Sequence, residues 1–104
     1  MLPRPDSREI DGMERLGAPP VVGPVLPPEI RIRNFDEVHL PWTPEMVMAE
    51  AARCLHCADQ PCIAACPLHN DIPLALWLTE HGDFEGASAV FRETSNFSEI
   101  CGRV

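Results

Sequence analysis

The sequence predicts a small all-α domain that follows an extended, proline-rich arm. Seven of the twelve prolines and three of the six glycines fall within residues 1–28, and proline removes a backbone donor and fixes φ. Three later segments each begin with a helix-capping residue and continue with helix-forming residues. From residue 35 onward about seventy residues remain, and a core of that size is marginal without a staple such as a metal.

We divide the chain into an arm, residues 1–29, and a helical domain, residues 30–104. We expect the arm to be extended and largely solvated, because its prolines disfavour regular structure. We expect the following stretch to be irregular and to pack on the domain through its spaced apolar residues. These residues are Ile30, Ile32, Phe35 and Val38.

Three helices are predicted in the domain. Thr43 caps the first helix, which has Pro44 at its first position and should run to about Arg53. Asp71 caps the second helix, residues 72–79, and Asp83 caps the third, residues 84–93. The third helix has one apolar stripe, made of Phe84, Ala87, Val90 and Phe91. Trp42 and Trp77 are expected to anchor the small core.

The charge is unevenly distributed. The net charge is −8, and residues 35–104 carry all of it, since the acids and arginines of residues 1–34 balance. An acidic domain argues against nucleic acid and against anionic membrane surfaces as partners. No apolar run approaches the roughly 18 residues of a membrane span, and no export signal is recognised. We therefore expect a cytoplasmic protein, in which clustered cysteines bind metal or serve redox chemistry rather than form disulfides.

Four cysteines fall within thirteen residues of the cysteine loop, residues 54–67, and Pro67 follows the last of them. A short loop with gaps of two to four residues can wrap a compact inorganic cluster and turn backbone amides toward its sulfides. The Cys-Pro ending recurs in bacterial ferredoxins, although the middle gap here is four residues rather than two. The pattern favours an iron–sulfur cluster bound by Cys54, Cys57, Cys62 and Cys66.

Two other interpretations of the cysteine loop stay open. Structural zinc also uses the Cys-x2-Cys spacing, but it usually joins two such knuckles. Disulfides suit neither the compartment nor an odd total of five cysteines. Outside the four, we expect Cys101 to be a small core residue rather than a distant ligand. We expect His56 to be a solvated loop side chain rather than a group that tunes the cluster.

Two runs of the sequence carry a family resemblance: RIRNFDEVHLPWTPEMVMAEAARCLHCADQPCIAACPLHNDIP and GDFEGASAVFRETSNFSEICGRV. They resemble the N-terminal iron–sulfur domain of the small (beta) subunit of NADPH-dependent glutamate synthase. The same module occurs in dihydropyrimidine dehydrogenase and in related FAD- and NAD(P)H-dependent oxidoreductases. The resemblance covers about residues 30–104.

The resemblance implies a small helical, ferredoxin-like domain with two [4Fe–4S] clusters. Cys54, Cys57 and Cys62 would ligate one cluster and Cys66 the second, with the remaining ligands in a later cysteine block. In the complete family enzyme NADPH reduces FAD, and the clusters pass electrons to a partner such as the glutamate synthase large subunit. The FAD and NADPH segments do not occur in these 104 residues, so we expect a fragment that is incomplete at its C-terminus and not a catalyst alone.

The sequence thus predicts an electron-transfer module between a flavin-binding domain or subunit and a partner active site. The alternative is a structural metal-binding interaction module without redox activity, in which the cysteine loop binds a structural metal and the arm docks a partner. Reversible reduction by dithionite distinguishes the two, because zinc shows none.

Overall fold

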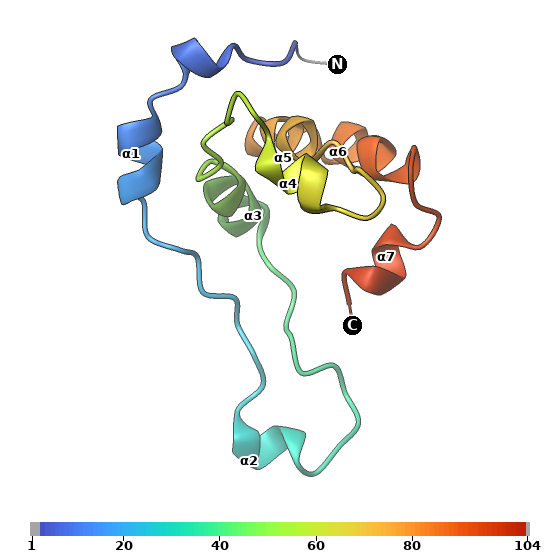
Figure 1. The fold of residues 1–104 in the computed structure, drawn as a ribbon. Coiled ribbons are helices and arrows are strands. Elements are labelled where there is room, and N and C mark those ends of the chain that lie inside the picture. Colours follow the sequence, from blue (N-terminus) through green and yellow to red (C-terminus); the bar gives the residue numbers. More distant parts are fainter. Residues whose placement is uncertain (1–2, 104) are drawn as a thin grey trace.

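The computed structural model of the chain describes residues 3–103 and is helical (Figure 1). Within these residues the β-type pairing is one isolated bridge, between Val25 and His39. None of the described helices has the length and apolar character that a membrane crossing requires. The elements in chain order are η1 (Ser7–Glu9), α1 (Gly12–Gly17), α2 (Pro28–Arg31), α3 (Pro44–Ala51), α4 (Pro61–Ala65), α5 (Ile72–Glu80), α6 (Phe84–Arg92) and α7 (Ser98–Cys101). The prediction of an all-α class is confirmed.

The core lies where α5 packs against α3 on one side and α6 on the other (Figure 1). It is small: the buried cluster consists of Ala75, Leu78, Ala87 and Val90, with Leu74 and Phe91 partly buried against it. Leu78 is the one large side chain that is fully buried among the described residues. The predicted stripe of α6 is confirmed except for Phe84, which remains 40% exposed at the first turn.

The predicted starts of the three core helices are confirmed. The side chains of Thr43, Asp71 and Asp83 each accept a hydrogen bond from the backbone N–H three residues later, at 3.3, 3.4 and 2.9 Å. Such bonds satisfy donors that the helix itself leaves unpaired. Gly82 has a φ of +81° just after α5, a backbone conformation that glycine adopts without steric cost and that commonly ends helices.

After α3, two short helices were not predicted. The structure has α4 within the cysteine loop and α7 near the C-terminus, both in segments that we expected to be loop or turn. Each has only four or five residues and neither has a side-chain cap, so hydrophobic periodicity cannot detect them. The available signal for α4 was Pro61, because proline is favoured at the first helical position.

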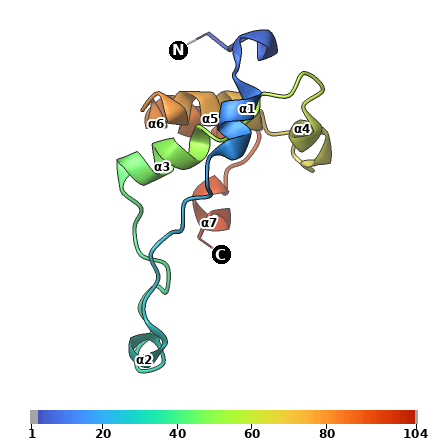
Figure 2. The same ribbon diagram turned by 90° about the vertical axis from the view of Figure 1, so that its left-hand side faces the viewer.

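The prediction of an extended arm is wrong for residues 3–18, although most of their described side chains are exposed, as expected. Residues 3–18 contain η1 and α1 and lie against the helical body (Figure 2). The Arg15 guanidinium donates to the Ala52 carbonyl at 2.8 Å, and the Trp77 indole N–H donates to the Pro3 carbonyl at 2.9 Å. Charged side chains hold this segment on the body, through contacts such as that of Arg15 with Ala52 and the ion pair of Arg4 with Asp71. Composition alone does not predict such contacts.

Residues 19–42 form an excursion that leaves the body, reaches α2 at its tip and returns to α3 (Figures 1 and 2). Its two limbs are joined by backbone hydrogen bonds from Leu26 N–H to Val38 O, at 2.8 Å, and from Leu40 N–H to Pro24 O, at 2.9 Å. The molecule consequently measures 50 × 32 × 24 Å.

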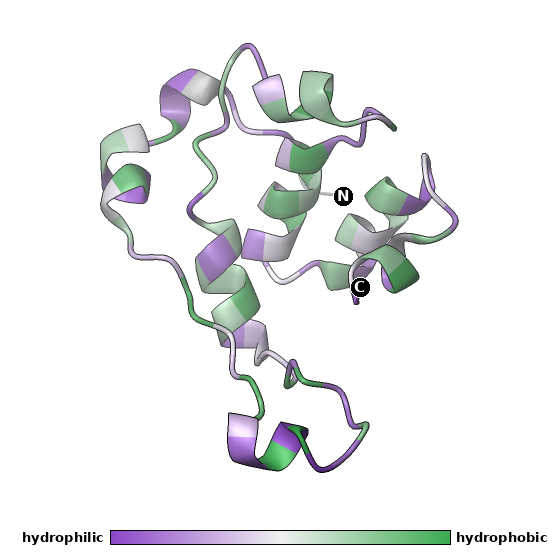
Figure 3. Ribbon diagram, turned by 60° about the horizontal axis from the view of Figure 1, so that its bottom comes forward, coloured by the Kyte–Doolittle hydropathy of each residue, from purple (hydrophilic) through white to green (hydrophobic). Residues whose placement is uncertain are grey.

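The expectation that residues 30–38 pack on the domain is wrong. Ile32 is 78% exposed and Phe35 is completely exposed, because the excursion stands clear of the core. Figure 3 shows hydrophobic residues along the excursion, at and beside α2. Trp42 is also not a core anchor: it lies over Gly23, where any added Cβ would collide with the indole ring. Trp77 lies on α5 and is half-buried.

We expect Leu78→Ala to lower the free energy of unfolding by about 2–5 kcal/mol, because it removes the largest side chain of a small core and leaves a cavity. Denaturant unfolding followed by circular dichroism measures the change. Val22→Ala is the control, since Val22 is 86% exposed on the excursion. Equal effects of the two substitutions would contradict the assignment of the core.

Candidate iron–sulfur site

The cysteine loop lies in the connection between α3 and α5. Cys54 follows the end of α3 and is half-buried, and Cys57 is exposed. Cys62 is exposed within α4, and Cys66 is the half-buried residue that ends α4. All four are free thiols.

The Cys54 thiol lies within electrostatic reach of two other cysteines. The pKa of the Cys54 thiol is raised above its ordinary value, mainly because burial disfavours the thiolate. A hydrogen bond from the backbone N–H of His56 opposes this rise in pKa, and the neighbouring thiolates of Cys62 and Cys57 add to it. The Cys54 thiol therefore lies near those of both Cys57 and Cys62.

Cys66 has different surroundings. The pKa of its thiol is lowered, first by the backbone N–H of Asn70 and then by that of Leu68, with a smaller contribution from His69. Its sulfur therefore faces a turn of backbone donors that follows the loop, and these donors stabilise a thiolate. The pKa of the Cys54 thiol thus responds to two other cysteines, whereas that of the Cys66 thiol responds to backbone donors.

Three non-glycine residues in this region have left-handed backbone conformations. Among the described residues, the non-glycine residues with positive φ are His56, Gln60 and His69, at 50°, 47° and 50°. Left-handed residues next to right-handed ones turn successive N–H groups toward one side, which creates concavities for anions, including iron–sulfur clusters. Three left-handed residues therefore lie among or beside the cysteines, whose thiolates are the usual ligands of iron–sulfur clusters.

His56 differs from the expectation of a solvated side chain. It is only 4% exposed, and its ring meets the Trp77 ring edge-on, with 5.4 Å between centroids. Trp77 also contacts His81, at 4.1 Å between centroids. Burial, followed by the charge of Arg15, lowers the pKa of His56. His56 is buried against Trp77, which lies 21 residues later in the chain. Its residue type and its sequence neighbours therefore could not predict its burial.

Polar atoms beneath the loop are left without partners. The His56 Nε2 and the Glu80 Oε2 are both buried and make no hydrogen bond. A hollow of about 240 Å³ adjoins this region between the arm and the loop. Its lining is formed by Arg4, Pro5, His56, Cys57, Ala58, Gln60 and Pro73.

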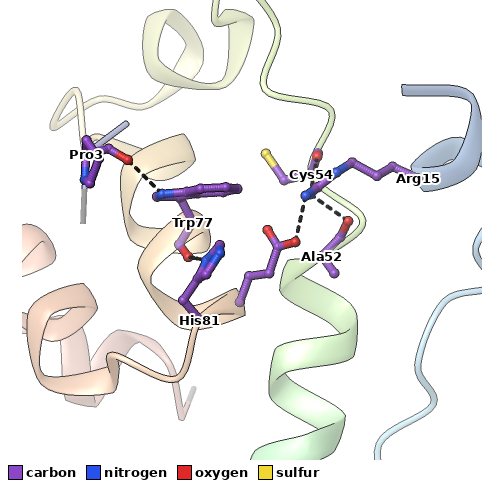
Figure 4. A network of polar contacts seen from close by, with 7 residues as sticks. Pro3, Arg15, Ala52, Cys54, Trp77 and His81 are labelled. Atoms are coloured by element: carbon purple, nitrogen blue, oxygen red, sulfur yellow. Dashed lines mark hydrogen bonds and ion pairs between the residues drawn. The ribbon is translucent and has the colours of Figure 1, made fainter. Parts of the chain in front are cut away.

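Arg15 is a site residue that the sequence analysis missed (Figure 4). Its guanidinium donates to the carbonyls of Ala52 and Cys54, at 2.8 and 3.0 Å, and to the Glu80 carboxylate, at 2.6 Å. It satisfies carbonyls that the end of α3 leaves unpaired. No sequence signal marks it, because its partners lie 37 to 65 residues away along the chain.

Cys101 is exposed on α7, so the expectation of a core cysteine is wrong. The helix has no buried residue and stands off the core. In residues 3–103, no three cysteine, histidine or acidic side chains converge to the spacing of ligands around a single metal ion. A cubane cluster binds each cysteine at a different iron atom, so its ligands need not converge in that way.

Gln60 offers a test of the loop backbone. We expect Gln60→Gly to raise the free energy of unfolding by up to about 1 kcal/mol, because glycine adopts a φ of 47° without steric cost. Gln60→Val should lower it by about 1 kcal/mol or more, since a β-branched residue is most strained there. Denaturant unfolding of both variants measures the difference, and the opposite order would contradict the left-handed conformation.

Curated proteins that resemble this chain are oxidoreductase subunits. The glutamate synthase [NADPH] small chain of Halomonas elongata is 38% identical over 78 residues, which are 75% of this chain and 16% of that protein. The corresponding chain of Azospirillum brasilense is 39% identical over 74 residues, covering 71% of this chain and 15% of that protein. The NAD-dependent dihydropyrimidine dehydrogenase subunit PreT of Escherichia coli O157:H7 is 36% identical over 70 residues, which are 67% of this chain and 17% of that protein.

This chain therefore spans about a sixth of the length of these relatives. The family described as dihydropyrimidine dehydrogenase domain II, 4Fe–4S cluster, matches residues 31–104. That range contains all three core helices, the cysteine loop and every cysteine of the chain. On sequence and on helical fold, the chain belongs to this family of 4Fe–4S domains.

Proposed function

We propose that this chain is the electron-transfer module of a flavin- and nicotinamide-dependent oxidoreductase. In this proposal Cys54, Cys57 and Cys62 ligate one [4Fe–4S] cluster and Cys66 belongs to a second. The observation that carries it is the match of residues 31–104 to a 4Fe–4S family, together with four free thiols in one short loop beside left-handed backbone.

The residues of the loop have distinct parts in this proposal. When bound, a [4Fe–4S] cluster accepts and donates one electron at a time. Cys54, at the end of α3, fixes the first ligand to the core, while the exposed Cys57 and Cys62 close the site from the solvent side. The buried His56 and the half-buried Trp77 pack edge-on beneath the loop and reduce its exposure to solvent, and lower solvent exposure is one determinant of cluster potential.

The partners in this proposal are the flavin and nicotinamide-binding parts of the oxidoreductase. The relatives named above include NADPH-dependent glutamate synthase chains and an NAD-dependent dihydropyrimidine dehydrogenase subunit. Residues 35–104 carry the entire net charge of −8, which would meet a complementary basic surface on a partner that resembles the glutamate synthase large subunit. The reducing cytoplasm is the compartment that keeps such thiols free.

We expect Cys57→Ser to lose most of the bound iron and the broad visible absorbance after anaerobic reconstitution. Cys101→Ser should retain both, and dithionite should bleach the parent absorbance reversibly. The pair is matched, because both thiols are exposed and neither substitution opens the core. Iron and sulfide analysis with absorbance spectroscopy measures the outcome. Stoichiometric zinc without iron in the parent would replace this proposal with a structural metal module.

We expect Cys66→Ser to retain most of the iron that Cys57→Ser loses, because the proposed function assigns Cys66 to the second cluster. Electron paramagnetic resonance of the reduced protein should show the same cluster signal in Cys66→Ser as in the parent. If Cys66→Ser lost as much iron as Cys57→Ser, the four cysteines would serve one cluster and the division into two sites would be wrong.

A further inference from the structure

We propose that the N-terminal clasp, residues 3–18, organises the cluster site, and that Arg15 in the clasp positions Cys54 and raises the reduction potential of the cluster bound there. This inference rests on the proposed function, since it concerns the first of the two clusters. The clasp lies outside residues 31–104, the range that matches the 4Fe–4S family.

The first contact of the clasp is with the start of the cysteine loop. Arg15 donates to the carbonyl of Cys54 itself, at 3.0 Å, and to that of Ala52, at 2.8 Å. These two carbonyls fix the backbone on which the Cys54 side chain stands (Figure 4). A planar guanidinium can hold two carbonyls and a carboxylate at once, which an ammonium group cannot do with the same geometry. Arg15 is therefore a positioning residue for Cys54.

The second set of contacts reaches the other end of the loop. Arg4 forms an ion pair with Asp71, the residue that caps α5 where the connection from the loop ends. The Trp77 indole N–H donates to the Pro3 carbonyl, at 2.9 Å. At the far end of the clasp, the Arg53 Nε–H donates to the Ala18 carbonyl, at 3.3 Å. The clasp therefore bridges the residues before and after the cysteine loop.

Arg15 belongs to the ion pair that is least exposed to water among the described ones, so solvent screens its charge less than that of the other paired arginines. The side chains of Arg15 and Glu80 are 15% and 18% exposed, the least exposed of the described ion pairs, and their closest atoms are 2.6 Å apart. The guanidinium is the end of this pair that is bonded to the Cys54 backbone. A positive charge stabilises the reduced, more negative cluster, and charge near a cluster is one of the factors that set its potential.

The test compares three substitutions in the anaerobically reconstituted protein. Arg15→Met removes the charge and the hydrogen bonds, whereas Glu80→Gln removes the neutralising carboxylate and leaves Arg15 charged. Arg92→Met is the matched control, because it removes the same charge from an exposed ion pair with Glu99 on the surface of the protein. The reduction potential is measured by titration followed by electron paramagnetic resonance.

We expect the potential to shift to more negative values in Arg15→Met and to more positive values in Glu80→Gln, with Arg92→Met unchanged. General damage to the fold cannot produce shifts of opposite sign. Unchanged potentials, or shifts of the same sign, would overturn the role of Arg15. If Arg15→Met held no cluster, Glu80→Gln alone would decide: a positive shift supports the inference and no shift overturns it.

A second measurement uses the cluster-free protein. Without the Arg15 contacts, the backbone amides from Arg53 to Cys57 should exchange with deuterium several-fold faster in Arg15→Met than in Arg92→Met, as followed by mass spectrometry of peptides. Equal rates would overturn the positioning role. The iron content of the parent tests the proposed function by itself, and the differences among variants test the clasp, so the two can fail separately.

Discussion

The packing of α5 between α3 and α6 is the interaction on which the rest of the structure depends. The cysteine loop begins where α3 ends and leads to the start of α5, so the contact between these helices fixes both ends of the loop. The buried cluster behind that contact is small, with Leu78 as its one large, fully buried side chain. A core of this size gives a small free energy of unfolding, so the chain tolerates little local strain.

The cysteine loop nevertheless contains strained backbone. A non-glycine residue in the left-handed region costs about 1–3 kcal/mol, and His56, Gln60 and His69 all lie within or just after the loop. Part of the compensation is visible: His56 is buried against Trp77, and Arg15 binds the carbonyls that lead into the loop. The His56 Nε2 beneath the loop, which can donate a hydrogen bond, is still unpaired. The first of the proposed clusters would add covalent bonds from three thiolates, those of Cys54, Cys57 and Cys62, to this balance.

Local rules predicted the parts of the fold that local interactions determine. The caps at Thr43, Asp71 and Asp83 depend on hydrogen bonds three residues away, so the sequence alone located three helices. The cysteine spacing likewise predicted the chemistry, and the family match supports a 4Fe–4S domain. The sequence could not predict the burial of His56 or the contact from Arg15 to Glu80, which join residues distant along the chain. Apolar residues of the excursion, such as Phe35, were misjudged because hydrophobicity alone does not say what will cover a side chain.

The central claim is that thiolates of one short loop bind iron and sulfide as a cubane cluster on this small helical body. Mössbauer spectroscopy of protein reconstituted with isotopically enriched iron tests it most directly. The account predicts the mixed-valence iron signal of a [4Fe–4S] cluster, at one or more clusters per chain. A spectrum of isolated high-spin ferrous ions, or no protein-bound iron under strict exclusion of oxygen, would contradict it.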